Sequence, residues 1–181
     1  MILFQGETIS GRQSLVTSTG LKTWLVQLAL VGAAVILPAL SHLLGLPVRT
    51  LLPMHWPVLA AGVLLGWRGG LLVGALSPAS NWLITGYPLP LVLPAMTLEL
   101  AAYGFVAGWF RERLGWNAFG ATAMGILAGR ALFIAAIWLT NGYTGLFGEY
   151  LIMALMPGIY AAAVQVGIIG MVGHLRDSNA D

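Results

Sequence analysis

The stretch LALVGAAVILPAL, residues 28–40, contains no charged side chain, and a second apolar run extends from Ala131 to Leu139. Strands that cross a bilayer instead alternate apolar and polar residues over segments of roughly ten residues. Unbroken apolar runs predict helices, because a helix satisfies every backbone hydrogen-bonding group within its own segment. The sequence therefore predicts an all-α protein.

The composition places these helices in a membrane. Of the 181 residues, 59% are hydrophobic and only 8% are charged, whereas a soluble domain averages about 25% charged residues. This balance excludes an ordinary cytosolic enzyme and a disordered chain, and the lack of cysteine excludes a disulfide scaffold. A net charge of +2 provides no basic patch for nucleic acid. We expect an integral membrane protein.

Six membrane-spanning helices are expected, packed as one bundle. Their predicted ranges are Trp24–Leu44, Leu51–Trp67, Gly69–Ile84, Leu91–Phe110, Ala118–Thr140 and Tyr150–Val172. The second and third are shorter than the ~20 residues of a full span. The bundle is a single domain over residues 23–174, between a polar N-terminal tail (1–22) and a cytoplasmic tail (175–181).

Tryptophans and positive charges predict how the bundle sits in the membrane. The seven tryptophans fall toward the predicted helix ends, where amphipathic rings prefer the headgroup level. With the N-terminus inside, the outer loops contain one basic residue, Arg49. The inner segments contain Arg12, Lys22, Arg68, Arg111, Arg113 and Arg176. This positive-inside bias predicts that both termini face the cytoplasm.

Two ionisable residues fall near the middle of the predicted spans. Such a group costs at least ~2.5–3.5 kcal/mol to insert, so each is a candidate site residue. At 1.5 Å per residue, Glu99 lies about 12 Å below the outer boundary and Arg130 about 18 Å above the inner one. These depths coincide in a ~30 Å core. We expect a buried ion pair or a shared polar cavity, with Asn81 at a similar depth; a pair that only fixes helix register fits the sequence equally well.

Other polar candidates lie near the outer surface. His55 could donate to a ligand or bind a metal ion, or it could simply be an interfacial residue beside Trp56. Tyr87, Asn141 and Tyr143 lie in outer connections that could close over a cavity, although such loops ordinarily only turn the chain. His42 and His174 are expected to be peripheral. Three scattered histidines and no cysteine predict no metal site.

No pattern of a catalytic or ATP-binding site is found in the sequence. Neither Ser77 nor Ser80 is surrounded by a Gly-x-Ser-x-Gly elbow. Aspartate occurs only in the tail, and there is no Gly-x-x-x-x-Gly-Lys-Ser/Thr loop. We therefore expect no catalytic residue, no cofactor and no ATP hydrolysis by this chain. A small intramembrane enzyme and a ligand-free assembly protein remain the alternatives from other functional classes.

Small residues recur at helical spacing and predict close helix packing, because they let two backbones approach each other. The spaced residues are Gly62, Gly66, Gly70 and Gly74; Gly104 and Gly108; and Gly125 and Gly129. On the first helix, Ala29 and Ala33 share a face, with Gly32 beside them. This face could equally pack internally or form an external docking surface.

Several short motifs together give the sequence a family resemblance. They are Pro53-Met54-His55-Trp56-Pro57-Val58, the glycines from Gly62 to Gly74, Leu76-Ser77-Pro78, Thr85-Gly86-Tyr87-Pro88, Glu99-Leu100-Ala101-Ala102-Tyr103-Gly104 with Gly108, and Met156-Pro157-Gly158. In their order and spacing, residues 25–174 resemble the substrate-binding S components of energy-coupling-factor (ECF) vitamin transporters.

The resemblance implies a fold, a function and partners. S components are six-helix proteins of bacterial or archaeal cell membranes that bind a vitamin in an outward-facing cavity. They dock through small residues of the first helix, here Ala29, Gly32 and Ala33, onto a transmembrane coupling subunit driven by two ATPases. The expected substrate-binding residues of this chain are His55, Ser80, Asn81, Tyr87, Glu99, Arg130, Asn141 and Tyr143.

The resemblance extends to the solitary, cobalamin-specific members, which makes cobalamin or a related corrinoid the expected substrate. Those members have a cobalt-binding cysteine in the third helix, where this chain has Ser80. A neutral hydroxyl binds cobalt far less well than a thiolate. A serine that replaced a natural cysteine would leave the corrinoid interpretation intact, and His55 could offer a nitrogen instead. A smaller zwitterionic or anionic vitamin would suit Glu99 and Arg130 equally well.

Overall fold

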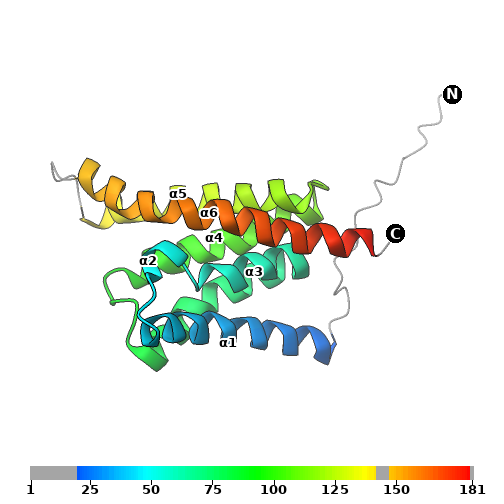
Figure 1. Cartoon of the computed structure of the whole chain (residues 1–181), viewed down its shortest axis with the longest axis horizontal. Coiled ribbons are helices and arrows are strands. Elements are labelled where there is room, and N and C mark those ends of the chain that lie inside the picture. The colour runs from blue at the N-terminus through cyan, green and yellow to red at the C-terminus, as the bar shows by residue number, and fades with distance from the viewer. Residues whose placement is uncertain (1–19, 142–146, 180–181) are drawn as a thin grey trace.

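The computed structural model describes residues 20–141 and 147–179, and within these ranges the chain is helical without any strand. The helices are α1 (Leu21–Leu43), α2 (Val48–Leu51), α3 (His55–Thr85), α4 (Leu93–Glu112), α5 (Ala118–Asn141) and α6 (Phe147–Ser178). Figure 1 shows the long helices lying along a common axis, with the start of α1 and the end of α6 at the same end of the molecule. The predicted all-α class is confirmed.

Four helical segments in the described chain are long and apolar enough to cross a membrane: α1, α3, residues Ala118–Thr140 and residues Gly158–Ser178. The prediction of six spanning helices is not confirmed as it stands. The residues predicted as the second and third spans form one helical range, α3. The predicted fourth span corresponds to α4, which is absent from these four and carries the charged residues Glu99, Arg111 and Glu112.

The helical range α3 is interrupted at Gly66. This residue has φ 76° and ψ −175°, a conformation that costs glycine little and other residues much. A Cβ atom on Gly70 would lie 2.7 Å from the Cα atom of Gly62, although eight residues of straight helix span about 12 Å. The chain therefore folds back at Gly66, just before the predicted helix boundary, and α3 consists of two arms packed against each other.

Glycines bring the two arms of α3 against α4. A Cβ atom on Gly62 would lie 2.5 Å from the carbonyl oxygen of Gly104, and one on Gly104 would collide with the backbone of Gly70. The backbones thus approach each other where no side chain intervenes. The other predicted glycines in similarly tight helix contacts are Gly74, Gly108, Gly125 and Gly129. Internal packing, one of the two roles expected for small residues, is confirmed for these positions.

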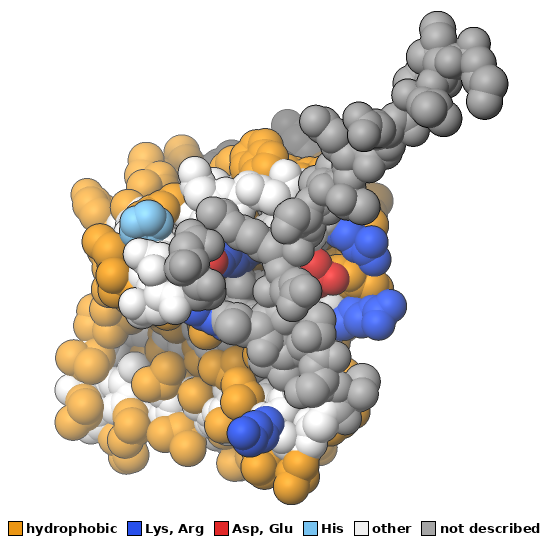
Figure 2. Space-filling model, turned by 90° about the vertical axis from the view of Figure 1, so that its right-hand side faces the viewer, with side chains coloured by type: hydrophobic (Ala, Val, Ile, Leu, Met, Phe, Trp, Pro, Cys, Tyr) orange, Lys and Arg blue, Asp and Glu red, His pale blue; other side chains and the backbone are white. Residues whose placement is uncertain are grey.

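One end of the bundle carries basic side chains. Figure 2 views the molecule from the end where α1 begins and α6 ends, and shows Lys and Arg side chains on that face with hydrophobic side chains around them. The hydrophobic surface continues along the helices, where α1 exposes Leu25, Leu28 and Ile36. Exposed leucines and isoleucines of this kind fit contact with lipid.

Replacing Gly104 with alanine should destabilise the bundle, because the new methyl group would collide with the backbone of α3. We expect a loss of roughly 1–3 kcal/mol, measured as a lower thermal unfolding temperature of the purified protein in detergent. Gly167→Ala is the matched control, since a Cβ atom there meets nothing within 4 Å. Equal unfolding temperatures for the two variants would contradict the close approach of α3 and α4.

Candidate functional site

A buried carboxylate links three helices in the interior of the bundle. The Glu99 Oε1 atom, on α4, lies 3.0 Å from Nη1 of Arg130 on α5. It also accepts a hydrogen bond from the Tyr103 hydroxyl at 3.1 Å and lies 3.7 Å from Nε2 of His55 on α3. The Glu99 and His55 side chains are each 2% exposed and that of Arg130 is 16% exposed. The predicted ion pair between Glu99 and Arg130 is present.

The charges of this cluster balance each other. The Glu99 carboxylate is paired with the Arg130 guanidinium, and a paired charge is far less costly to bury than an unpaired one. The His55 ring packs against Tyr103, with ring centroids 5.1 Å apart.

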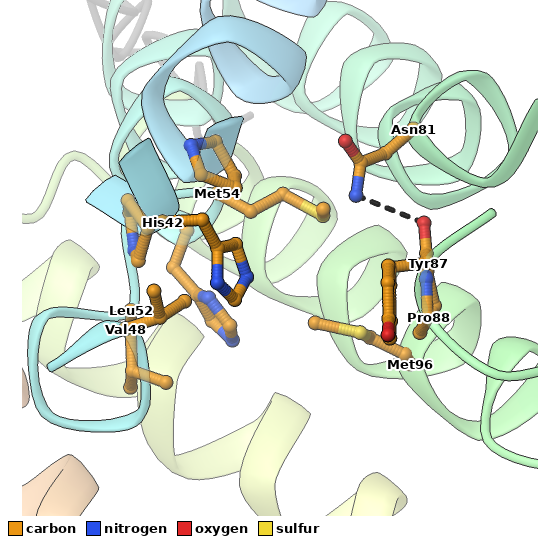
Figure 3. Close-up of a pocket in the computed structure, with 11 residues that line it drawn as sticks. His42, Val48, Leu52, Met54, Asn81, Tyr87, Pro88 and Met96 are labelled. Carbon is orange, nitrogen blue, oxygen red and sulfur yellow. Dashed lines mark hydrogen bonds between the residues drawn. The ribbon is translucent and has the colours of Figure 1, made fainter. Parts of the chain in front are cut away.

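A cavity of about 130 Å³ opens beside this cluster. It lies at the α2 end of the bundle, opposite the end where α6 terminates (Figure 1). Figure 3 shows the Met54 and Met96 side chains entering it from opposite sides. Its walls are mostly apolar. The lining residues are Pro38, His42, Val48, Leu52, Pro53, Met54, His55, Asn81, Tyr87, Pro88 and Met96.

Two buried polar residues line the cavity and have unused hydrogen-bonding atoms. Asn81, which is 4% exposed, donates from Nδ2 to the Tyr87 carbonyl oxygen at 2.9 Å (Figure 3), while its Oδ1 has no partner. Neither ring nitrogen of His55 makes a hydrogen bond. Buried polar atoms are normally paired, so these atoms mark the cavity as a place where a ligand can bind.

The predicted site residues take different positions. Three of them, His55, Asn81 and Tyr87, line the cavity. Glu99 and Arg130 are not among the lining residues. Glu99 lies behind His55, 3.7 Å from its Nε2 atom, and Arg130 is paired with Glu99. Ser80 is half-buried and does not line the cavity. The side chain of Asn141 and the whole of Tyr143 lie outside the described part of the chain.

Other residues of the site were not predicted. His42, which was expected to be peripheral, lines the cavity with its ring centroid 6.3 Å from that of Tyr87. Met54, Met96 and Tyr103 were also missed. Tyr103 follows Glu99 by four residues, so the two share a helix face. Their hydrogen bond could therefore have been predicted from the sequence. Nothing local in the sequence marks His42, because its position depends on how α1 packs against α3.

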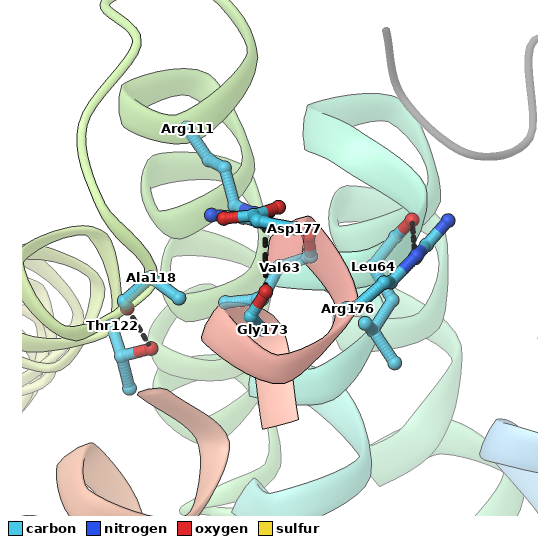
Figure 4. A network of polar contacts seen from close by, with 8 residues as sticks. All are labelled: Val63, Leu64, Arg111, Ala118, Thr122, Gly173, Arg176 and Asp177. Carbon is cyan, nitrogen blue, oxygen red and sulfur yellow. Dashed lines mark hydrogen bonds and ion pairs between the residues drawn. The ribbon is translucent and has the colours of Figure 1, made fainter. Parts of the chain in front are cut away.

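A second polar network, at the opposite end, holds the break in α3 (Figure 4). A helix end leaves its last carbonyl groups without helical partners. Arg111 donates from Nε to the Val63 carbonyl at 2.9 Å, and Arg176 donates to the Leu64 carbonyl at 3.1 Å. Arg111 also forms an ion pair with Asp177. We assign this network to folding, since each of these contacts ties α4 or α6 to the break or to each other.

The residues expected to dock a partner lie on α1. Ala29 is exposed, and Gly32 and Ala33 are half-buried. A Cβ atom on Gly32 would meet nothing within 4 Å. The described structure therefore leaves room beside this face of α1. Among the described residues, no group of three or more His, Cys, Asp or Glu side chains is placed to hold a metal ion.

The comparisons with known proteins identify one family. The model of the family described as "ECF transporter, substrate-specific component" matches residues 25–173. No curated protein matches the chain, and no solved structure matches it. The matched residues include most of α1, all of α2 to α5 and most of α6.

Replacing Glu99 with glutamine should destabilise the protein by roughly 3–5 kcal/mol, because Arg130 would remain as a buried charge without its partner. Thermal unfolding in detergent measures the change. The double variant Glu99→Gln/Arg130→Gln should lose less stability than the sum of the single variants. Glu149→Gln, on an exposed side chain, is the control. Strict additivity in this cycle would show that the pair contributes nothing.

Proposed function

We propose a function from one premise: the chain belongs to the family of ECF transporter substrate-specific components. Members of this family are transporter components and not enzymes, so the chain is the substrate-binding subunit of such a transporter. We infer that it captures its substrate in the cavity at the α2 end. The observation that carries this inference is the pair of buried, partly unpaired residues, His55 and Asn81, in an otherwise apolar cavity. Ligand sites typically combine apolar walls with a few polar groups.

The proposed topology counts each arm of α3 as a separate crossing, which gives six crossings with both termini in the cytoplasm. The start of α1 and the end of α6 share the end that carries Lys and Arg side chains (Figure 2), in keeping with the positive-inside rule. The first arm, residues 55–65, rises only about 16 Å. It therefore covers only about half of a ~30 Å core, and we infer that the cavity lies in the remaining, outer half, beyond the start of this arm.

Cobalamin or a related corrinoid is the leading substrate, on the family resemblance of the sequence. Neutral imidazole is a common metal ligand, and His55 lines the cavity with a carboxylate, Glu99, 3.7 Å from one ring nitrogen. Metal-binding histidines are typically oriented by such a carboxylate. We propose that His55 takes the role that the cysteine has in the cobalamin-specific members, since Ser80 does not line the cavity.

A smaller vitamin is the second candidate, and the size of the cavity favours it. The cavity measures about 130 Å³, below the roughly 300–1,000 Å³ of typical ligand sites. A corrinoid would require the cavity to widen, whereas a single-ring vitamin would need little rearrangement. The connections at its mouth are exposed around Gly45 and Gly86 and are the segments that could move.

Transport requires partners that this chain does not supply. We propose that α1 docks through Ala29, Gly32 and Ala33 onto a transmembrane coupling subunit, which is driven by two ATPases. Small residues permit the close helix approach that association in lipid depends on. The ATPase partners, and not this chain, then use ATP. We propose that the chain lies in the cell membrane of a bacterium or archaeon.

Native mass spectrometry of the purified protein against a panel of vitamins, corrinoids included, tests the proposed capture. We expect one vitamin to remain bound. His55→Phe should weaken that binding roughly tenfold or more, since the ligand would lose a polar contact in a buried site. His174→Phe, on an exposed residue of α6, is the matched control. A bound vitamin that is unaffected by His55→Phe would place the site elsewhere.

Leucine at both Ala29 and Ala33 should abolish vitamin uptake by cells that carry the whole transporter, because the larger side chains would keep the coupling helix away. Binding of the vitamin to the isolated subunit should not change. The control replaces Ala131 and Ala135 with leucine, since these exposed alanines have the same spacing on α5. Uptake that survives the α1 changes would refute docking on this face.

A further inference from the structure

We propose that the side-chain rings of His42 and Tyr87 form a clamp at the mouth of the cavity, which holds one flat aromatic ring of the substrate between them. The inference rests on the proposed function in taking this cavity as the substrate site. It adds the chemical class of the group that enters the mouth, a single aromatic ring without a fixed charge. It also makes His42 and Tyr87 specificity-determining residues.

The spacing of the two rings is close to what a third ring between them requires. Their centroids are 6.3 Å apart and their planes are inclined by 31°, which is nearer to parallel than to perpendicular. Figure 3 places His42 and Tyr87 on opposite sides of the cavity that both residues line. Carbon atoms pack at about 3.5 Å, so a ring between two parallel rings needs about 7 Å between the outer two. The clamp therefore has to open by less than about 1 Å.

The remaining walls and the size of the cavity also suit a single ring. The Met54 and Met96 side chains enter from two further sides (Figure 3), and thioether sulfur makes favourable contacts with aromatic rings, often at the ring edge. The volume of about 130 Å³ is close to the roughly 150 Å³ of an apolar cavity that binds benzene. None of the described lining residues is Lys, Arg, Asp or Glu, so no carboxylate, ammonium or guanidinium group there would pair with a charged ring.

The backbone of Tyr87 is held in place although its side chain is 60% exposed. Its carbonyl oxygen accepts a hydrogen bond from Asn81 Nδ2 at 2.9 Å, and its N–H donates to Thr85 Oγ1 at 3.2 Å. The Thr85 hydroxyl in turn donates to the Asn81 carbonyl at 2.8 Å. A group that is positioned before binding loses less freedom when the ligand arrives. His42 lies in the last turn of α1, and helix ends fray, so we assign the small opening movement to His42.

Two uncharged probes test the clamp on the full chain in detergent. Benzamide and cyclohexanecarboxamide carry the same amide group, on a flat aromatic ring and on a puckered saturated ring. Ligand-observed NMR titration measures their binding, with empty detergent micelles as the blank. We expect benzamide to bind roughly threefold or more tightly, Tyr87→Leu to remove this preference, and Tyr87→Phe to retain it. Tyr160→Leu is the matched control, since Tyr160 is a 74% exposed tyrosine of α6.

The outcomes separate the clamp from the proposed capture of a vitamin. Equal binding of the two probes, no binding of benzamide, or a preference that survives Tyr87→Leu would overturn the clamp. A vitamin retained in native mass spectrometry should contain an aromatic ring and bind more weakly to Tyr87→Leu. A retained vitamin without such a ring would overturn the clamp and still support capture. A preference for benzamide in a protein that retains no vitamin would support the clamp and contradict capture.

Discussion

The Glu99 carboxylate is the group on which the arrangement of the site depends. It meets Arg130 of α5, Tyr103 of its own helix and His55 of α3 around a single oxygen atom. A carboxylate in a bilayer interior is tolerable only when it is paired and hydrogen-bonded. The charges of Glu99 and Arg130 balance within the cluster, and neither residue lines the cavity. The ion pair therefore lies behind His55, which does line the cavity.

The break at Gly66 is the second requirement, because it brings together residues from the two arms of α3. His55 begins the first arm and Asn81 lies near the end of the second, yet both line one cavity. A straight helix would separate them by about 39 Å. Arg111 and Arg176 stabilise the break by capping carbonyl groups of the first arm, so basic residues at one end of the bundle support the site at the other.

Sequence reasoning succeeded where regular helix geometry was sufficient. The depths of Glu99 and Arg130 followed from a constant rise per residue, and their ion pair is present. The spaced glycines correctly predicted close packing, because a residue without a side chain lets two helix backbones approach each other wherever it occurs. Sequence reasoning failed where the direction of a side chain or the packing of a helix determines which residues line the cavity. Ser80 precedes Asn81 but points elsewhere, and His42 enters the cavity only because α1 packs beside the folded α3. The count of six spans was not confirmed, since four segments of the described chain are long and apolar enough to cross a membrane.

A structure of the protein with the vitamin that it retains tests the central claim most directly. That claim is capture of the substrate at the α2 end, against His55 and Asn81, with the Glu99–Arg130 pair behind His55. The account predicts a ligand between Met54 and Met96, within hydrogen-bonding or coordination distance of the His55 and Asn81 side chains. A ligand bound at the Arg111–Asp177 end, or one whose acid group displaces Glu99 from Arg130, would contradict it.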